Sequence, residues 1–269
     1  INRLGFPSKG LDYFVNNLAS RPLDKCGPVG ANVGINTGTD DPVRDVTLCL
    51  ERVVPFADYL VVNISCPNVE DRGQVFACRP DSAAQVVQTV RRNSDSKIPI
   101  FAKLSPDVTD IVDIARSVSQ AGATGVSVIN TLLGMVINTT TMRPALAGVT
   151  GGVSGPAIRP VAVRCVWQIR SALPDLPIIG MGGIRSGHDA LEFILAGANA
   201  ISVGTSIFND PSAPMRIQTE LQQELASRGF TSLAQAVSYA HREADIASME
   251  EAPSSAAEDS ETEWDFISE

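Results

Sequence analysis

The sequence predicts an α/β fold of the (β/α)8 barrel type. Six short apolar runs alternate with amphipathic stretches, and nearly every run ends in a polar residue or a glycine. Runs rich in Val and Ile are typical of parallel strands that are buried on both faces. Barrels collect functional residues at the carboxyl ends of many strands, whereas a doubly wound fold concentrates its motif after one early strand, and no GxGxxG motif follows a strand here.

The expected elements follow one another along the whole body of the chain. The runs interpreted as strands cover residues 29–35, 59–65, 98–104, 126–130, 177–182 and 200–203. The stretches interpreted as helices cover residues 10–18, 42–54, 82–92, 109–120, 156–173, 187–195, 215–228 and 232–244. Pro and Gly mark the joins, and no internal repeat stronger than this alternation is evident. Because a closed barrel has eight strands, the first two are expected before residue 1.

Composition and charge exclude several classes of partner. The 269 residues are 44% hydrophobic and 19% charged, which predicts a globular body with an ample core. There are 21 basic residues against 30 acidic ones, and nine of the acids lie in residues 245–269, which hold no Lys or Arg. The balanced body argues against nucleic acid, and no apolar run is long enough for a membrane segment. We expect one barrel domain over 1–244 and an acidic, disordered tail over 245–269.

Cysteine and histidine usage points to a reducing compartment and no metal. The five cysteines are odd in number and include no CxxC pair, which predicts a cytoplasmic protein rather than a disulfide framework or a metal site. Both histidines fall in helix-like sequence, so a Ser-His-Asp triad or a His-based metal centre is poorly supported. His188 is interpreted as a structural or surface residue. Packing roles are expected for Cys26, Cys49, Cys78 and Cys165.

The segment Asn63-Ile64-Ser65-Cys66-Pro67-Asn68 combines a thiol with two amides where a strand gives way to a loop. A thiol above a barrel mouth can act as a nucleophile, or as a base once its pKa is lowered. The alternative is a buried, inert cysteine. The flanking Asn63 and Asn68 suit a polar ligand better than a core, so Cys66 is the candidate catalytic residue.

Four asparagines at loop or strand ends, Asn2, Asn63, Asn68 and Asn130, suggest a planar polar substrate. Each amide carries both a donor and an acceptor, which suits the edge of a pyrimidine-like ring. Any one of them alone would more often serve a turn or a cap.

Lys103 ends an apolar run, where a buried amine is costly unless a negative partner, such as a reduced flavin, lies beside it. The alternative is a lysine whose side chain extends from the strand end so that its amine reaches solvent.

Glycine clusters mark the later loops of the chain. They are Gly151-Gly152 with Ser154-Gly155, then Gly182-Gly183, then Gly204-Thr205. Glycine lets backbone N–H groups approach a phosphate closely, and the loops after the last two barrel strands are the usual phosphate site of this fold. These clusters indicate a phosphorylated cofactor or substrate, and flavin mononucleotide (FMN) is a natural candidate.

With these residues in place, the sequence resembles the dihydroorotate dehydrogenases, FMN-dependent (β/α)8 barrels of pyrimidine biosynthesis. The matching stretches run from residue 1 to about residue 244 and comprise INRLGF, ADYLVVNISCPN, FAKLSPDVTDIV, VINTLLGM, TGGVSGPAIRPVAV, PIIGMGGIRSGHDALEFILAGA and VGTSIF. The cysteine of NISCPN indicates class 1, and SPDVTDIV, NTLLGM and GGVSGPAI are closest to class 1B. INRLGF and ADYLVVN read more like class 2.

The resemblance implies a role for each candidate residue. Cys66 would take the proton from C5 of dihydroorotate while a hydride passes from C6 to FMN, giving orotate. Substrate contacts are implied for Asn2, Asn63, Asn68, Asn130 and Thr131, and cofactor contacts for Asn63, Lys103, Gly152, Gly182, Gly183, Gly204 and Thr205.

The resemblance also implies partners. A homodimer is usual among such proteins, and class 1B enzymes work with an FAD and iron–sulfur subunit that passes electrons to NAD. Fumarate and quinone are alternative electron acceptors. Two further hypotheses compete with this one: a related FMN dehydrogenase acting on another dihydropyrimidine such as dihydrouracil, and a non-catalytic barrel fragment that docks through its acidic tail.

Overall fold

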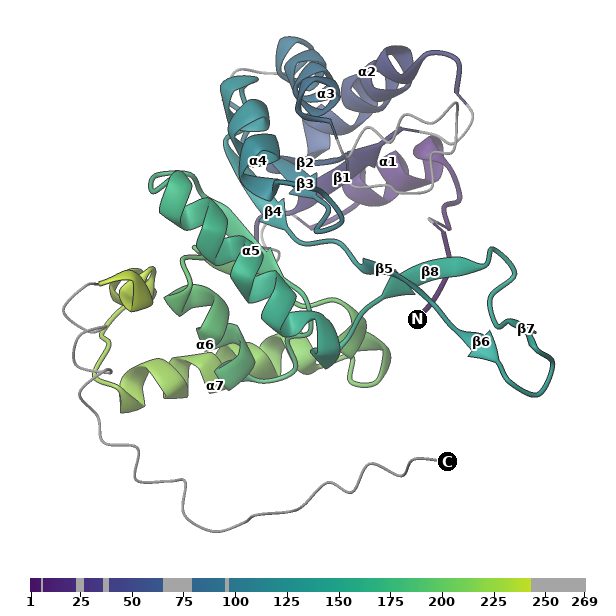
Figure 1. Ribbon diagram of the computed structural model, residues 1–269. Helices are drawn as coiled ribbons and strands as arrows, with labels where there is room; N and C mark the ends of the chain where they lie inside the picture. The colour runs from purple at the N-terminus through teal and green to yellow at the C-terminus, as the bar shows by residue number, and fades with distance from the viewer. Residues whose placement is uncertain (6, 23–26, 36–38, 65–78, 95–96, 243–269) are drawn as a thin grey trace.

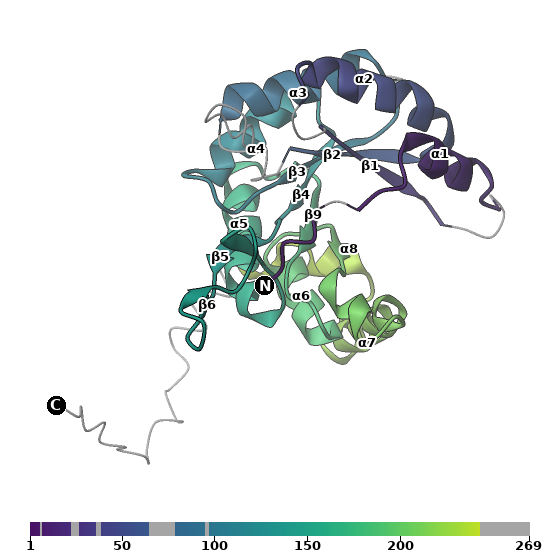
Figure 2. The same ribbon diagram turned by 90° about the vertical axis from the view of Figure 1, so that its right-hand side faces the viewer.

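A curled parallel sheet forms the centre of the protein, and helices cover its outer face (Figures 1 and 2). The computed structural model describes residues 1–5, 7–22, 27–35, 39–64, 79–94 and 97–242. The sheet contains, in spatial order, β1 (Gly30–Gly34), β2 (Tyr59–Asn63), β3 (Ile100–Leu104), β4 (Gly125–Val128), β9 (Ile178–Met181) and β10 (Ala200–Ser202). All neighbouring pairs are parallel.

The helices alternate with the strands, and α1 to α7 pack on one another in chain order, as in the outer ring of a barrel. They are α1 (Leu11–Ala19), α2 (Pro42–Val53), α3 (Pro80–Arg92), α4 (Ile111–Gln120), α5 (Arg159–Ala172), α6 (Gly187–Leu195), α7 (Ala213–Ser227) and α8 (Leu233–Ala236). Short 3₁₀ turns are η1 (Val54–Phe56), η3 (Pro156–Ile158), η4 (Thr205–Phe208) and η5 (Tyr239–His241). Within the described residues the sheet ends at β1 and β10, so two more strands would be needed to close it.

The expected strand and helix order is confirmed, and the alternation of burial shows how the sheet is built. In β3, Ile100, Ala102 and Leu104 are buried against the helices, while Phe101 and Lys103 face the concave side. The register pairs Lys103 with Asn63 on one side and with Ser127 on the other. Residues paired across a parallel sheet face the same side, so the concave side gains a polar layer near the carboxyl ends of its strands.

Two turns of the sheet repeat one hydrogen-bonding pattern, which the sequence reasoning missed. Residues 121–128 read AGATGVSV and residues 196–203 read AGANAISV. In the first turn Arg91 donates to the carbonyl oxygens of Gly122 and Ile98. In the second, Arg170 donates to those of Gly197 and Pro174. Each arginine therefore connects the end of its own helix, by hydrogen bonds, to the turn that follows the next helix in the chain.

The residue two places after each turn glycine completes the pattern. The Thr124 hydroxyl oxygen accepts the Ile100 N–H at 3.0 Å, and the Asn199 side-chain oxygen accepts the Ile178 N–H at 2.9 Å. Both acceptors fix the start of the preceding strand, β3 or β9. The units β3-α4-β4 and β9-α6-β10 are thus two copies of one local design, visible only when the bonds are known.

The end of the body differs from the single helix that the sequence predicts over residues 232–244. The helix α8 ends at Ala236, and Ser238 adopts a left-handed conformation with φ 61°. Tertiary bonds override the helical pattern here. The Ser238 N–H donates to the Ile194 carbonyl at 3.1 Å, and the His241 ring stacks on Trp167 at a centroid distance of 3.6 Å.

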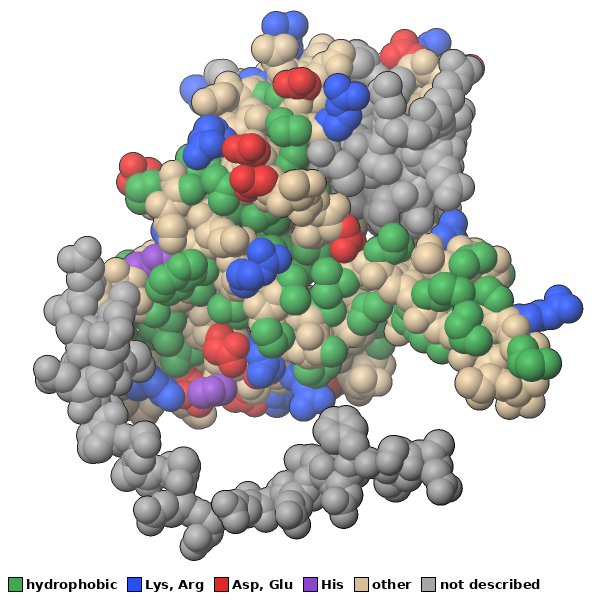
Figure 3. Space-filling view, in the orientation of Figure 1, with side chains coloured by type: hydrophobic (Ala, Val, Ile, Leu, Met, Phe, Trp, Pro, Cys, Tyr) green, Lys and Arg blue, Asp and Glu red, His purple; other side chains and the backbone are tan. Residues whose placement is uncertain are grey.

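Between β4 and α5 the chain leaves the sheet as an antiparallel arm that the sequence did not predict (Figure 1). It consists of β5 (Leu132–Met135) with β8 (Thr150–Val153), and of β6 (Ile137–Asn138) with β7 (Arg143–Pro144). Figure 3 shows hydrophobic side chains over the surface of this arm. Those exposed are Leu133, Met135, Val136, Ile137, Met142 and Val149.

Several sequence expectations lie outside the described residues: Cys66 and Asn68, the packing cysteines Cys26 and Cys78, and the acidic tail of residues 245–269. These stay predictions. The other packing cysteines are confirmed as free thiols, with Cys165 buried and Cys49 partly buried. In the part of the chain that the structure describes, no helix has both the length and the apolar character needed to cross a bilayer.

The hydrogen bonds of Arg91 and of Arg170 to carbonyl groups of two segments are called the arginine clamps, and the clamp of Arg170 leads to a stability prediction. Replacing Arg170 by Ala would leave buried carbonyl oxygens without a donor, and we expect a loss of about 3 kcal/mol in the free energy of unfolding. Arg164 lies on the same helix but is exposed, so Arg164→Ala should change stability by less than about 0.5 kcal/mol. Urea denaturation of both variants measures the difference. Equal stabilities would show that the clamp contributes little.

Candidate functional site

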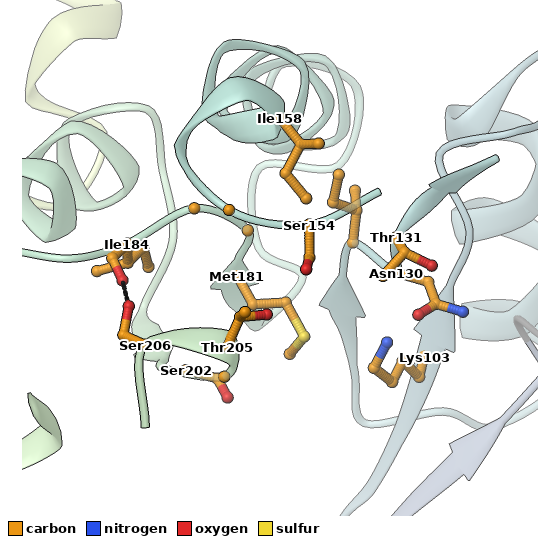
Figure 4. Close-up of a pocket in the computed structure, with 15 residues that line it drawn as sticks. Lys103, Asn130, Thr131, Ser154, Ile158, Met181, Ile184, Ser202, Thr205 and Ser206 are labelled. Atoms are coloured by element: carbon orange, nitrogen blue, oxygen red, sulfur yellow. Dashed lines mark hydrogen bonds between the residues drawn. The ribbon is translucent and has the colours of Figure 1, made fainter. Parts of the chain in front are cut away.

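A cavity of about 170 Å³ opens at the carboxyl ends of β3, β4, β9 and β10 (Figure 4). Seven of the predicted site residues line it: Lys103, Asn130, Thr131, Gly182, Gly183, Gly204 and Thr205. Lys103 comes from β3 itself and the others from the loops that follow β4, β9 and β10, so they lie up to about a hundred residues apart in the chain. The parallel sheet brings them together because all its strands end at the same edge.

The cavity has two chemically different sides. Figure 4 shows Lys103, Asn130 and Thr131 on one side and Thr205 and Ser206 on the other, with Met181 between them. The first side carries side-chain amine, amide and hydroxyl groups. The second side consists largely of the backbone of the Gly182-Gly183 and Gly204-Thr205 segments.

The charged feature of the first side is the Lys103 amine. Lys103 is the last inward-facing residue of β3, in a strand whose other residues are apolar. Desolvation by burial lowers the pKa of its amine from the ordinary value of 10.5 to about 8. No carboxylate of the described residues forms an ion pair with it. An anionic group in the cavity would therefore stabilise the protonated amine.

The backbone side has the geometry of an anion cradle. Gly182 and Gly183 have φ values of 132° and 76°, which side chains other than glycine rarely allow. Among the described residues, the N–H groups of Gly183, Gly204 and Thr205 donate to no protein acceptor. Unpaired N–H groups without a covering side chain suit a phosphate, and these lie after the last two strands of the sheet, the usual place in this fold.

The N-terminus of α6 does not supply these donors. Its capping box is closed by Ser186, whose hydroxyl oxygen accepts the Asp189 N–H at 3.1 Å. The Gly187 N–H donates to a carboxylate oxygen of Glu220 at 2.7 Å. The expected cap at Ser186 is thereby confirmed, and the donors available to an anion in this cavity are those of the loop rather than of the helix end. His188 is exposed on this helix, as expected.

Three other predicted residues do not line the cavity. Asn2 and Gly152 bond to each other through their backbones, with N···O distances of 3.0 and 2.8 Å. The Gly152 N–H is thus already used, and a Cβ on Gly152 would lie 2.4 Å from the Thr131 hydroxyl oxygen. Gly152 therefore allows Thr131 to pack beside it. Asn63 lies on the concave side next to Lys103, one strand away from the cavity wall.

Further residues line the cavity that the sequence did not single out, among them Met181, Ser202 and Ser206. Ser206 is the most informative, because its hydroxyl donates to the Ile184 carbonyl at 2.8 Å and so joins the two glycine segments. Each of these residues lies within three positions of a flagged glycine. That adjacency was the available signal, but serine alone carries no distinctive chemistry.

The fold and the cavity define a class of protein: a (β/α)8-barrel protein whose site pairs unpaired backbone N–H groups with a buried amine. Within that class, the chain belongs to the dihydroorotate dehydrogenase family, since the family model described as "Dihydroorotate dehydrogenase" matches residues 1–225.

Curated relatives and solved structures agree with this assignment. The "Dihydroorotate dehydrogenase B (NAD(+)), catalytic subunit" of Geobacter sp. (strain M21) is 45% identical over 233 residues, 87% of this chain and 74% of the relative. The protein of the same name from Desulforudis audaxviator is 45% identical over 242 residues, 90% of this chain and 77% of the relative. The resemblance to class 1B is thereby confirmed.

Two crystal structures of DHODH from Eimeria tenella share the fold. The complex with ferulenol gives a TM-score of 0.75 at 28% identity and covers 90% of this chain and 71% of that one. The ligand-free form gives a TM-score of 0.76 at 29% identity, with 90% and 74% covered. The barrel expectation is confirmed by this similarity.

The lowered pKa of Lys103 leads to a pH prediction. The unfolded chain holds a proton on this amine up to about pH 10.5, whereas the folded protein releases it near pH 8. The unfolded state then binds more protons between these values, so stability rises with pH in that window, by about 2 kcal/mol from pH 8 to 10. Lys103→Met should remove this rise. Denaturation of flavin-free protein measures it, and an identical pH dependence in both proteins would contradict a buried amine.

Proposed function

We propose that this chain is the catalytic subunit of an FMN-dependent dihydroorotate dehydrogenase of the B type, which oxidises dihydroorotate to orotate in pyrimidine biosynthesis. The observation that carries the proposal is a single cavity in which the Lys103 amine faces unpaired backbone N–H groups. Relatives about 45% identical over most of the chain are named as catalytic subunits of that enzyme.

The residues fit FMN at both ends of the cavity. The N–H groups of Gly183, Gly204 and Thr205 would hold the phosphate, and Gly182 allows the sharp turn that presents them. The Lys103 amine would lie against the pyrimidine end of the flavin and offset the negative charge that develops there on reduction. When bound, FMN supplies the hydride acceptor of the reaction.

The substrate is assigned to the amide-rich side. Asn130 and Thr131 line the cavity, and Asn63 lies beside Lys103 on the concave face. We propose that these residues, with Asn2 and Asn68, bind the carboxylate and ring edge of dihydroorotate. Asn2 would act from the rim, where its backbone is fixed to Gly152.

Proton removal is assigned to Cys66, three residues after Asn63 in the chain. As a thiolate it would accept the proton from C5 of dihydroorotate while the hydride leaves C6, so that a C5–C6 double bond forms and orotate results. To return to its resting thiolate form, Cys66 must then release this proton to solvent.

We also propose that Gly152 contributes to the site, through the room that it leaves for Thr131.

The electrons are proposed to leave through a separate FAD and iron–sulfur subunit, as the name "catalytic subunit" and the NAD(+) of the relatives suggest. We also propose that the chain forms a homodimer and acts in the cytoplasm. The free thiols of Cys49 and Cys165 support a reducing compartment.

The proposal is tested by an anaerobic titration of the purified full-length protein. The absorption band of oxidised flavin should be present and should bleach when dihydroorotate is added, whereas dihydrouracil, which lacks the carboxylate, should leave it unchanged. Bleaching by dihydrouracil alone would favour the dehydrogenase of another dihydropyrimidine. A protein that stays colourless with added FMN would favour the non-catalytic fragment.

A Cys66→Ser variant tests the assigned base. A serine hydroxyl is a far poorer base at neutral pH, so flavin reduction by dihydroorotate should slow by about 100-fold or more. FMN binding should be unchanged, which the visible spectrum checks in the same sample. Stopped-flow reduction measures the rate, and an unaltered rate would remove Cys66 from the mechanism.

A further inference from the structure

We propose that Asp189, neutralised by Arg159, is the positioning residue that holds the loop of residues 182–186 ready for the flavin phosphate. This segment, residues 182–186, is termed the phosphate loop. The inference rests on the proposed function, because it requires FMN in the cavity, but it concerns residues that touch neither flavin nor substrate.

The phosphate loop joins β9 to α6 and begins with two glycines in conformations that few residues adopt. Glycine has more backbone freedom to lose than any other residue. A loop of this kind presents its N–H groups to one point only if the surrounding structure fixes it, and otherwise binding must itself order the loop. Fixed contacts are therefore expected around it.

The Asp189 carboxylate supplies two of those contacts from a buried position. Its Oδ2 accepts the N–H of Arg185 at 2.8 Å and the N–H of Ser186 at 3.1 Å. These bonds run from the first turn of α6 back into the loop and reach the two residues that directly follow Gly182, Gly183 and Ile184. Hydrogen bonds to an ionised acceptor are stronger than neutral ones, so this carboxylate fixes the half of the loop next to α6.

Arg159 binds the other oxygen of the same carboxylate, with 2.6 Å between Nη1 and Oδ1. It also lies 3.2 Å from Glu192 through Nε. Arg159 begins α5, four residues after Gly155, which lines the cavity. A Cβ on Gly183 would lie 2.6 Å from the Gly155 carbonyl oxygen. The ion pair therefore joins the start of α5 to the first turn of α6, near the place where Gly183 and Gly155 come close together.

The charges explain why the arginine is needed. A carboxylate beside a phosphate site would repel the ligand unless a cation offsets it, and the effect is strong where water is largely excluded. Arg159 offsets Asp189 without entering the cavity. Removing Arg159 alone would keep both loop hydrogen bonds but leave the negative charge uncompensated.

The other copy of the βαβ unit provides an internal contrast. There Asp110 caps α4 in the usual forward direction and accepts the N–H groups of Val112 and Asp113. No described carboxylate of that helix bonds backwards into the loop after β3. The backward bonds of Asp189 thus occur in the copy that carries the unpaired glycine N–H groups.

Binding of FMN and of riboflavin to the flavin-free protein tests the proposal, because riboflavin has the same ring but no phosphate. The wild-type protein should prefer FMN. Asp189→Asn should weaken FMN binding by about tenfold and riboflavin binding by less than about twofold. Arg159→Gln should act in the same direction, and the double variant should lose less than the sum, because both changes affect one ion pair. Quenching of flavin fluorescence measures the affinity of each of the four proteins for both flavins.

The control variant is Asp113→Asn. Asp113 occupies the first turn of α4 and pairs with Arg116 at 3.2 Å, but on an exposed surface; both affinities should stay unchanged. Equal weakening of FMN and riboflavin by Asp189→Asn, or no change in either, would overturn the positioning role. Should that variant fail to fold, Arg159→Gln decides by the same comparison. A wild-type protein that binds both flavins equally, or neither, would instead overturn the phosphate site and with it the proposed function.

Discussion

The two arginine clamps are the constraint on which the rest of the structure depends. Arg91 and Arg170 each fill the space that a turn glycine leaves open, since a Cβ on Gly122 or Gly197 would lie 3.0 or 2.5 Å from the arginine Cγ. Each guanidinium then donates to carbonyl groups of two separate segments. Because the turn leads directly into a strand, the clamp sets where that strand begins, and therefore where its functional end lies.

The cavity is built from matching positions of the two clamped units. When Ile100 is aligned with Ile178, Lys103 of β3 matches Met181 of β9. When residues 121–128 are aligned with residues 196–203, Asn130 matches Thr205. All four line the cavity. One copy contributes the amine and amide, while the other contributes the glycine backbone. On the proposed assignment, the repeated scaffold therefore has two chemical roles, one for the ring system of the flavin and one for its phosphate.

Electrostatics connect these two halves. The amine side lacks a described countercharge, and the backbone side lacks acceptors for its donors. Both deficits are satisfied by an anionic, ring-bearing ligand that spans the cavity, which is what FMN provides. The carboxylate that lies nearest the phosphate loop, Asp189, is already neutralised by Arg159. The protein therefore offers attraction at both ends of the ligand without a competing negative charge.

The sequence by itself determined the order of the main strands and helices, the barrel class and seven of the fifteen residues that line the cavity. It could do so because apolar runs, terminal polar residues and glycine pairs are local signals, and the parallel sheet places every carboxyl end at one edge. It could not determine the arm of residues 132–153, the break at Ser238, or the paths of Arg91, Arg170 and Asp189. Those depend on partners dozens of residues away, such as Gly197 for Arg170 and Arg159 for Asp189, which only the tertiary structure brings within hydrogen-bonding distance.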